Sequence, residues 1–203
     1  MGGMRTACLL MALLVSPAAA CTARSGERTA ALVELYTSAG CKACVPAERW
    51  LAGLSARYPA ERVVPVMLQV SQVVPPARRL TPLQRLALVP MPYVLVQGTD
   101  FARWHTDDFE REMARLNASP ARARLELQIL SRNAGGLKVR ARASSDLQAD
   151  LFVGTQAPFE WQGPLALGQH EVRVPVEGAV VAFVQDRRTG EVLQALRLGL
   201  CFP

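Results

Sequence analysis

The sequence predicts an α/β domain followed by a small all-β domain of antiparallel strands packed as a sandwich. Residues 31–117 alternate short apolar runs with stretches of helical periodicity. Residues 122–200 consist almost entirely of short apolar runs of strand length. The turn-rich stretch 117–120 separates the two patterns. We therefore expect a first domain over residues 31–118 and a β-rich domain over residues 121–203.

The first 20 residues are typical of a secretory signal peptide. Arg5 precedes an apolar run over residues 7–15, and small residues follow up to Ala20. No later stretch approaches the roughly 18 continuous apolar residues that a membrane helix needs. We expect a signal peptide at residues 1–20, an N-terminal segment at residues 21–30, and a periplasmic or secreted protein without a transmembrane span.

The first domain begins with a predicted βαβ unit. The apolar run 31–36 predicts a strand, and residues 50–58 carry apolar side chains at near-helical spacing. Residues 63–70 show no polar alternation, as expected of a strand that is covered on both faces in a parallel sheet. Two such strands joined by a helix form a right-handed parallel unit.

The rest of this domain is expected to be a helix, a hairpin and a second helix. A short helix is expected to begin at Thr81-Pro82, with threonine as N-cap. Residues 93–97 predict a strand, residues 98–100 a turn and residues 101–104 a partner strand. A last helix is expected from about Asp107, where acidic residues suit the positive end of the helix dipole.

The second domain is predicted to contain six strands. A hairpin turn is expected at residues 186–190. The predicted strands cover residues 124–130, 137–143, 151–155, 171–176, 180–185 and 192–198.

The mature chain carries an even number of cysteines. The full sequence has 5 cysteines, and Cys8 lies in the signal peptide, which leaves Cys21, Cys41, Cys44 and Cys201. An even number in an exported chain suits disulfides. The short spacing makes Cys41 and Cys44 the easiest pair to close, and a structural disulfide between Cys21 and Cys201 is then expected.

A lipid anchor at Cys21 is the alternative to that second disulfide. The sequence Ala19-Ala20-Cys21 fits the end of a lipoprotein signal. Ala18 stands where such signals usually carry leucine, and the even number of cysteines favours the disulfide.

The Cys41-Lys42-Ala43-Cys44 motif lies where the first strand leads into a helix. Backbone N–H groups at a helix start and a nearby cation favour a thiolate. We expect Cys41 to be the exposed attacking sulfur and Cys44 the more buried resolving one, as a redox-active centre requires. The partners of such a pair are protein thiols or disulfides.

Three other interpretations of the cysteine pair remain. A permanent, unreactive disulfide forms in an oxidising compartment whether or not it is used. A zinc site needs two more ligands, and the histidines are only His105 and His170. A copper-transfer site could recruit Met67 or Met91. We expect no metal and no cofactor.

Glu34 interrupts the apolar run of the first predicted strand, seven residues before Cys41. A buried carboxylate is costly, so its presence there suggests a role as proton acceptor for Cys44. The alternative is that Glu34 reaches solvent or pairs with an arginine.

The basic residues indicate no nucleic-acid partner. The formal net charge is +6. The arginines and lysines are scattered singly or in pairs such as Arg78-Arg79 and Arg187-Arg188, without interleaved aromatic residues.

The order of elements, with a Cys-x-x-Cys at the end of the first strand, is that of a thioredoxin-like domain. Such folds resemble one another in a cis proline that faces the cysteine pair, and Pro92 stands at that point of this chain. A cis bond is essentially restricted to X-Pro. If Met91–Pro92 is cis, the backbone of Met91 can pair with an extended substrate beside Cys41. The alternative is an ordinary trans loop.

The chain also resembles, as a short and divergent member, a family of secreted bacterial thioredoxin-like proteins, domain of unknown function twelve twenty-three. The resemblance is carried by residues 33–48, Pro92, residues 96–98, residues 181–185 and residues 190–193. The family implies a thioredoxin-like domain followed by β structure, with no firmly assigned reaction.

Two functions are compatible with these observations. The first is an exported thiol-disulfide oxidoreductase in which Cys41 attacks, Cys44 resolves, Glu34 accepts a proton and Pro92 shapes the substrate groove. The second is a non-catalytic secreted binding protein in which the Cys41–Cys44 pair is a structural disulfide. The fold alone does not choose between them.

Overall fold

The computed structural model describes residues 21–69, 90–156, 162–176 and 178–201. The predicted signal peptide and the helix expected at Thr81-Pro82 lie outside the described residues. The helices are η1 (Lys42–Cys44, a 3-10 helix), α1 (Val45–Arg57) and α2 (Asp107–Ala118). The strands are β1 (Thr22–Arg24), β2 (Ala31–Thr37), β3 (Val63–Gln69), β4 (Tyr93–Val96), β5 (Thr99–Asp100), β6 (Arg124–Asn133), β7 (Gly136–Ser144), β8 (Ala149–Thr155), β9 (Gln162–Leu165), β10 (Gly168–Val174), β11 (Val180–Asp186) and β12 (Val192–Leu198).

Within the described ranges the strands form three sheets of four strands each. The outer sheet has the order β1-β6-β7-β10, the central sheet β12-β11-β8-β9 and the mixed sheet β3-β2-β4-β5. Within the mixed sheet β2 and β3 run parallel, and the other pairs are antiparallel. The parallel βαβ unit predicted from the sequence is therefore confirmed.

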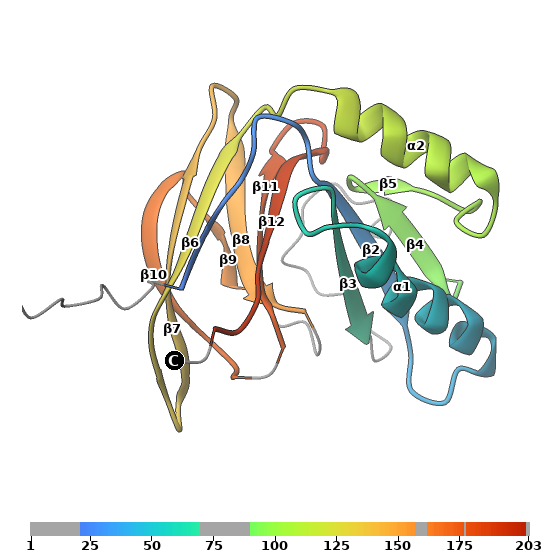
Figure 1. Cartoon of the computed structure of the whole chain (residues 1–203), viewed down its shortest axis with the longest axis horizontal. Helices are drawn as coiled ribbons and strands as arrows, with labels where there is room; N and C mark the ends of the chain where they lie inside the picture. Colours follow the sequence, from blue (N-terminus) through green and yellow to red (C-terminus); the bar gives the residue numbers. More distant parts are fainter. Residues whose placement is uncertain (1–20, 70–89, 157–161, 177, 202–203) are drawn as a thin grey trace, which may run out of the picture.

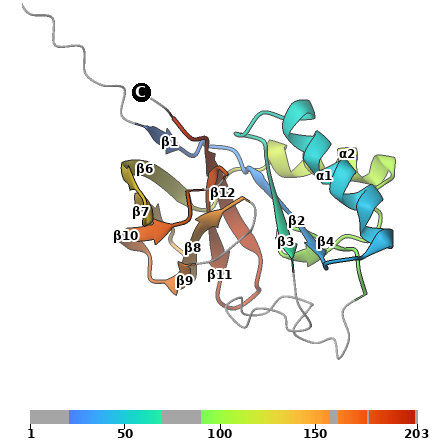
Figure 2. The same cartoon turned by 90° about the horizontal axis from the view of Figure 1, so that it is seen from below.

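The sheets and helices stack as four layers (Figure 1). The outer sheet is followed by the central sheet, the mixed sheet and then the helices. Figure 2 shows both helices on the same side of the mixed sheet. One apolar core lies between the outer and central sheets, a second between the central and mixed sheets, and a third between the mixed sheet and the helices. The central and mixed sheets are therefore covered on both faces.

The expected α/β thioredoxin-like domain followed by a separate small all-β domain is wrong. The chain is mostly β-sheet, and among the strand pairs of the described residues only β2 and β3 run parallel. Both α-helices of this part of the chain cover one face of the mixed sheet, and the other face packs on the central sheet. A strand buried on both faces has the same sequence pattern whether a helix or a second sheet covers it, so this pattern did not distinguish the two architectures.

Several element boundaries also differ from the sequence prediction. The partner of β4 is the two-residue strand β5, and residues 101–104 do not form a strand, because residues 102–105 form a turn. β1 and β9 were not expected, because each is too short to show a periodic pattern. The helix expected from Asp107 is confirmed as α2, and the hydroxyl of Thr106 caps it by accepting from the amide of Asp108.

Two buried glutamines join the N-terminal half of the chain to the central sheet. The side-chain oxygen of Gln97 accepts from the amide of Leu32 at 2.6 Å, and its side-chain nitrogen donates to the carbonyl of Val192 at 2.9 Å. The side-chain oxygen of Gln194 accepts from the amide of Ala30 at 2.7 Å. Because buried backbone groups need partners, these side chains fix how the mixed sheet sits on β12.

None of the helices in the described part of the chain is long and apolar enough to cross a lipid bilayer.

Replacing Gln194 by leucine is expected to destabilise the fold by about 2–4 kcal/mol, because the amide of Ala30 and the carbonyl of Arg28 would lose their buried partner. The measurement is the free energy of unfolding in denaturant. Gln148→Leu is the matched control, because Gln148 is exposed, and it should change stability by less than about 0.5 kcal/mol. Equal stability of the two variants would contradict the role given to Gln194.

Candidate functional site

The Cys41–Cys44 disulfide closes the corner between β2 and α1. β2 ends at Thr37, and Gly40 then turns the chain with a positive φ of 76°, which residues with a side chain rarely adopt. The amide of Cys44 donates to the carbonyl of Cys41 at 3.1 Å, and the two Cα atoms lie 5.3 Å apart. The predicted local pairing of these cysteines is confirmed. We call residues 38–44 the cysteine corner.

The two cysteines of this corner differ in burial. Cys44 is 0% exposed, whereas Cys41 is partly exposed and is followed by the exposed residues Lys42 and Ala43. Cys44 stands three residues before Ala47, a residue of α1 that packs on the mixed sheet. Cys41 is therefore the member of the pair that another molecule can reach.

The start of α1 favours negative charge at the cysteine corner. Cys44 is the N-cap of α1, and no side chain caps the first turn. Pro46 lies in that turn and has no N–H of its own. The unpaired backbone N–H groups of a first turn carry the positive end of the helix dipole, which stabilises a thiolate.

Glu48 supplies a carboxylate next to this corner. The hydroxyl of Thr37 donates to Oε1 of Glu48 at 2.6 Å, and this bond ties the end of β2 to the first turn of α1. Glu48 follows Cys44 by four residues, so the two lie on the same side of the helix. Sequence reasoning missed this residue, although the four-residue spacing from Cys44 was a signal that pointed to it.

Glu34 lies on the other face of the mixed sheet. It is 0% exposed, and the hydroxyl of Tyr36 donates to its Oε1 at 3.2 Å. Side chains alternate along a strand, so Glu34 shares the face of Leu32 and Tyr36, which packs on the central sheet. The helices cover the opposite face. The structure therefore does not bring Glu34 to the side of β2 on which α1 and Cys44 lie.

Tyr36 remains a hydrogen-bond donor in this buried layer. Burial raises the pKa of the Tyr36 hydroxyl far above its usual range, and the neighbouring Tyr93 adds to the rise. The hydroxyl therefore stays protonated and continues to donate to Glu34. Glu34 does not reach solvent, and its pairing with an arginine and its role as proton acceptor both stay predictions.

Pro92 lies at the end of the mixed sheet where the cysteine corner begins. The Met91–Pro92 peptide bond is cis, as predicted. Pro92 immediately precedes β4, whose first residue, Tyr93, pairs with Tyr36 near the end of β2. Both Met91 and Pro92 are partly exposed, so this backbone is accessible beside the corner.

The two methionines considered as copper ligands lie in different layers. Met67 packs against the core under the helices, whereas Met91 packs against the core between the mixed and central sheets. Among the described residues no cluster of three or more histidine, cysteine, aspartate or glutamate side chains could hold a metal ion.

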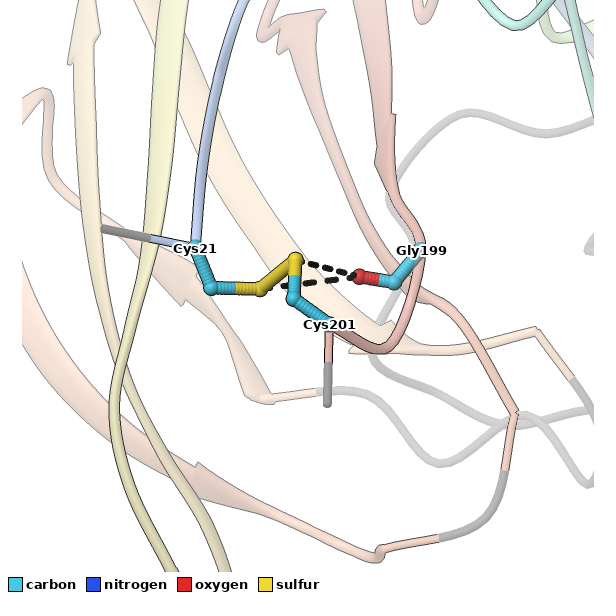
Figure 3. Close-up of a disulfide and its surroundings, with 3 residues drawn as sticks. All are labelled: Cys21, Gly199 and Cys201. Carbon is cyan, nitrogen blue, oxygen red and sulfur yellow. Dashed lines mark hydrogen bonds between the residues drawn. A yellow bond between two sulfur atoms is a disulfide. The ribbon is translucent and has the colours of Figure 1, made fainter. Parts of the chain in front are cut away.

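The second predicted disulfide, Cys21–Cys201, is also confirmed. Its Cα atoms lie 5.7 Å apart across a sequence separation of 180 residues. Figure 3 shows the bridge beside the carbonyl of Gly199, which lies within 3.8 Å of the Cys21 sulfur. Closing so long a loop stabilises a fold by on the order of 5 kcal/mol in the chain-entropy model.

This bridge bears on the lipid-anchor alternative. A sulfur that forms a disulfide has no valence left for a thioether-linked lipid. The Cys21–Cys201 bond therefore favours the disulfide over acylation of Cys21. The bridge joins the start of β1 in the outer sheet to the chain segment after β12, whereas the cysteine corner adjoins the helix layer (Figure 1).

No family model matches the chain, and no curated protein is significantly similar to it. Two solved structures are similar in fold. A structural-genomics protein from Agrobacterium tumefaciens has a TM-score of 0.54 at 18% sequence identity, over 86% of this chain and 96% of that chain. HBP35 of Porphyromonas gingivalis has a TM-score of 0.55 at 11% identity, over 87% of this chain and 76% of that chain. At these identities the likeness concerns the fold alone, and the family resemblance stays a prediction.

After reduction, a soluble alkylating reagent is expected to modify Cys41 at least about tenfold faster than Cys44, because only Cys41 is partly exposed. Mass spectrometry of peptides from a brief iodoacetamide pulse measures both rates. The same pulse on guanidinium-unfolded protein is the control and should give similar rates. Faster modification of Cys44 in the folded protein would contradict the assignment of Cys41 as the accessible sulfur.

Proposed function

We propose that this chain is an exported protein that exchanges thiols and disulfides with other proteins through Cys41 and Cys44. The observation that carries the proposal is the unequal burial of two cysteines joined in one disulfide, with Cys41 accessible and Cys44 enclosed. Disulfide exchange requires an accessible attacking sulfur and a resolving partner close to it.

In the reducing direction the Cys41 thiolate attacks one sulfur of a partner disulfide. A bond forms between Cys41 and that sulfur, the partner's S–S bond breaks, and its other sulfur leaves as a thiolate. Cys44 then gives up its proton and attacks the Cys41 sulfur, which forms the Cys41–Cys44 disulfide and releases the second partner thiol. The partner disulfide gains two electrons and the protein dithiol loses two. The reverse sequence oxidises a partner dithiol.

Glu48 is the better-placed proton acceptor for the resolving step. Its carboxylate lies on the side of α1 that carries Cys44, and its hydrogen bond from Thr37 holds it against the end of β2. A carboxylate acts as a general base when it lies within reach of the proton it takes, directly or through one water. Glu34, on the far face of β2, lacks this placement.

The periplasm or the exterior of the cell is the proposed location. The two disulfides suit an oxidising compartment, and the first 20 residues resemble a signal peptide. Both disulfides join cysteines of the mature chain that remains after removal of that segment.

Cys44→Ser is expected to trap a mixed disulfide between Cys41 and a test protein disulfide, because the resolving thiol is absent. Cys41→Ser should give no such adduct, since Cys44 is buried. Non-reducing electrophoresis with mass spectrometry detects the adduct. The control is Arg49→Ser, at an exposed position of α1 outside the cysteine pair, which should exchange at the wild-type rate.

Absence of any adduct with Cys44→Ser would contradict the proposal. If the Cys41→Ser, Cys44→Ser double variant also kept the cellular phenotype, the chain would instead be a non-catalytic binding protein with a structural disulfide at the cysteine corner.

Glu48→Gln is expected to slow the resolution of a Cys41 mixed disulfide by about tenfold or more, because the resolving thiol loses its nearby base. Stopped-flow release of a chromogenic thiol measures this step. Thr37→Val is the matched control for loss of the hydrogen bond between Thr37 and Glu48. It removes this 2.6 Å bond but keeps the carboxylate, so it should slow the resolution step less than Glu48→Gln does. A larger effect of Glu34→Gln than of Glu48→Gln would overturn the assignment.

A further inference from the structure

A hollow of about 420 Å³ opens on the solvent face of the outer sheet, which lies at the opposite end of the layer stack from the helices (Figure 1). It is lined by three arginines from three different strands, Arg24 of β1, Arg124 of β6 and Arg142 of β7. Its other polar side chains are those of Glu126, Gln169, Ser25 and Ser144. We call Arg24, Arg124, Glu126, Arg142 and Gln169 the arginine hollow. Its volume falls in the range of ligand-binding clefts.

Strand register explains why the arginines gather there. Arg24 stands opposite Glu126, and Glu126 stands opposite Arg142, so the three form one row across the sheet. Arg142 in turn stands opposite Gln169, and Arg124 lies two residues before Glu126 on the same strand. Their sequence neighbours point into the core between the outer and central sheets, so these side chains point outward.

The hollow carries more positive than negative charge. Glu126 lies 3.3 Å from the Arg24 guanidinium and 3.7 Å from that of Arg142. None of the ion pairs within the described ranges includes Arg124, which is exposed. Ion pairs at such exposed positions are weak, so all three guanidinium groups remain available to a further anion. Their planar forks match carboxylate geometry.

The surroundings extend this basic character along β7. Lys138 and Arg140 precede Arg142 at alternate positions of β7, and both pair with the single carboxylate of Glu171. Alternate residues of a strand lie about 7 Å apart on one face. Charged groups on alternate residues of an extended polypeptide have the same spacing.

We propose that the arginine hollow binds an extended, acidic segment of a partner protein through its carboxylate side chains. Arg24 and Arg142 lie two strands apart, about 10 Å, and Glu126 stands between them. A compact phosphate that bridged these two arginines would meet the Glu126 carboxylate. Separate carboxylates on alternate residues of a peptide can each contact a different arginine, so none of them has to lie next to the Glu126 carboxylate.

The Cys21–Cys201 bridge supports this surface. β1 has only three residues and is an edge strand that pairs with β6 alone. The bridge fastens the residue that precedes β1, as Figure 3 shows. It thereby keeps Arg24 in the row that lines the hollow.

The test uses the full mature protein with both disulfides and a fluorescein-labelled peptide of six Glu-Ser repeats. Fluorescence anisotropy should show saturable binding that weakens as salt is added. Arg124→Ala and Arg142→Ala should each lower the affinity about fivefold. Arg111→Ala is the matched control, because Arg111 is an exposed arginine on α2 that also pairs with a carboxylate, and it should leave the affinity unchanged.

A Gln-Ser peptide of the same length should not bind. Loss of affinity in Arg111→Ala equal to that in Arg142→Ala would overturn the assignment of the site, as would the absence of saturable binding. Free glutarate tests for a small dicarboxylate and inorganic phosphate for a compact dianion. Competition by either at concentrations as low as those of the acidic peptide would overturn the choice of a polypeptide ligand.

Discussion

The stacking of the three sheets and the helices depends on the burial of the mixed sheet on both faces. All seven residues of β2 are buried, with Ala31, Val33 and Leu35 under the helices and Leu32 and Tyr36 against the central sheet. Neither face of such a strand is stable in water, so the β-rich half of the chain must dock on it. Gln97 and Gln194 then fix the register of this docking, because they satisfy backbone groups that the docking buries. The cysteine corner extends from the end of β2, and the Thr37–Glu48 hydrogen bond ties that end to α1.

The strands were more predictable than their packing. Continuous apolar runs located β2, β3 and most strands of the second half, because burial requires such runs wherever a strand is enclosed. These apolar runs do not show whether a helix or a second sheet covers the strand. Phe152 and Phe183 stack with ring centroids 5.0 Å apart in the layer between the central and mixed sheets, yet in sequence they are merely apolar strand residues. The expectation of an α/β thioredoxin-like domain followed by a small all-β domain failed for this reason.

The candidate site was predictable where chemistry is local. The disulfides followed from the number and spacing of the cysteines, and the position of Cys44 inside the start of a helix implied its burial. Contacts between residues that are far apart in the sequence could not be predicted in this way. Glu34 attracted attention as a carboxylate in an apolar strand, but strand alternation places it away from α1. Thr37 and Glu48 are ordinary surface-type residues in sequence, and only the fold joins them beside the corner. The arginine hollow likewise depends on cross-strand register, which scattered arginines in a sequence do not reveal.

The most direct test of the central claim is the redox equilibrium of the mature protein in glutathione buffers, with acid quenching and mass spectrometry of each cysteine pair. An exchanging disulfide has an accessible sulfur and equilibrates with glutathione. The account predicts that Cys41–Cys44 is reduced and reoxidised reversibly, with attack at the partly exposed Cys41 sulfur. A Cys41–Cys44 bond that stays oxidised at every glutathione ratio would show that the corner is a structural staple and would contradict the proposed exchange.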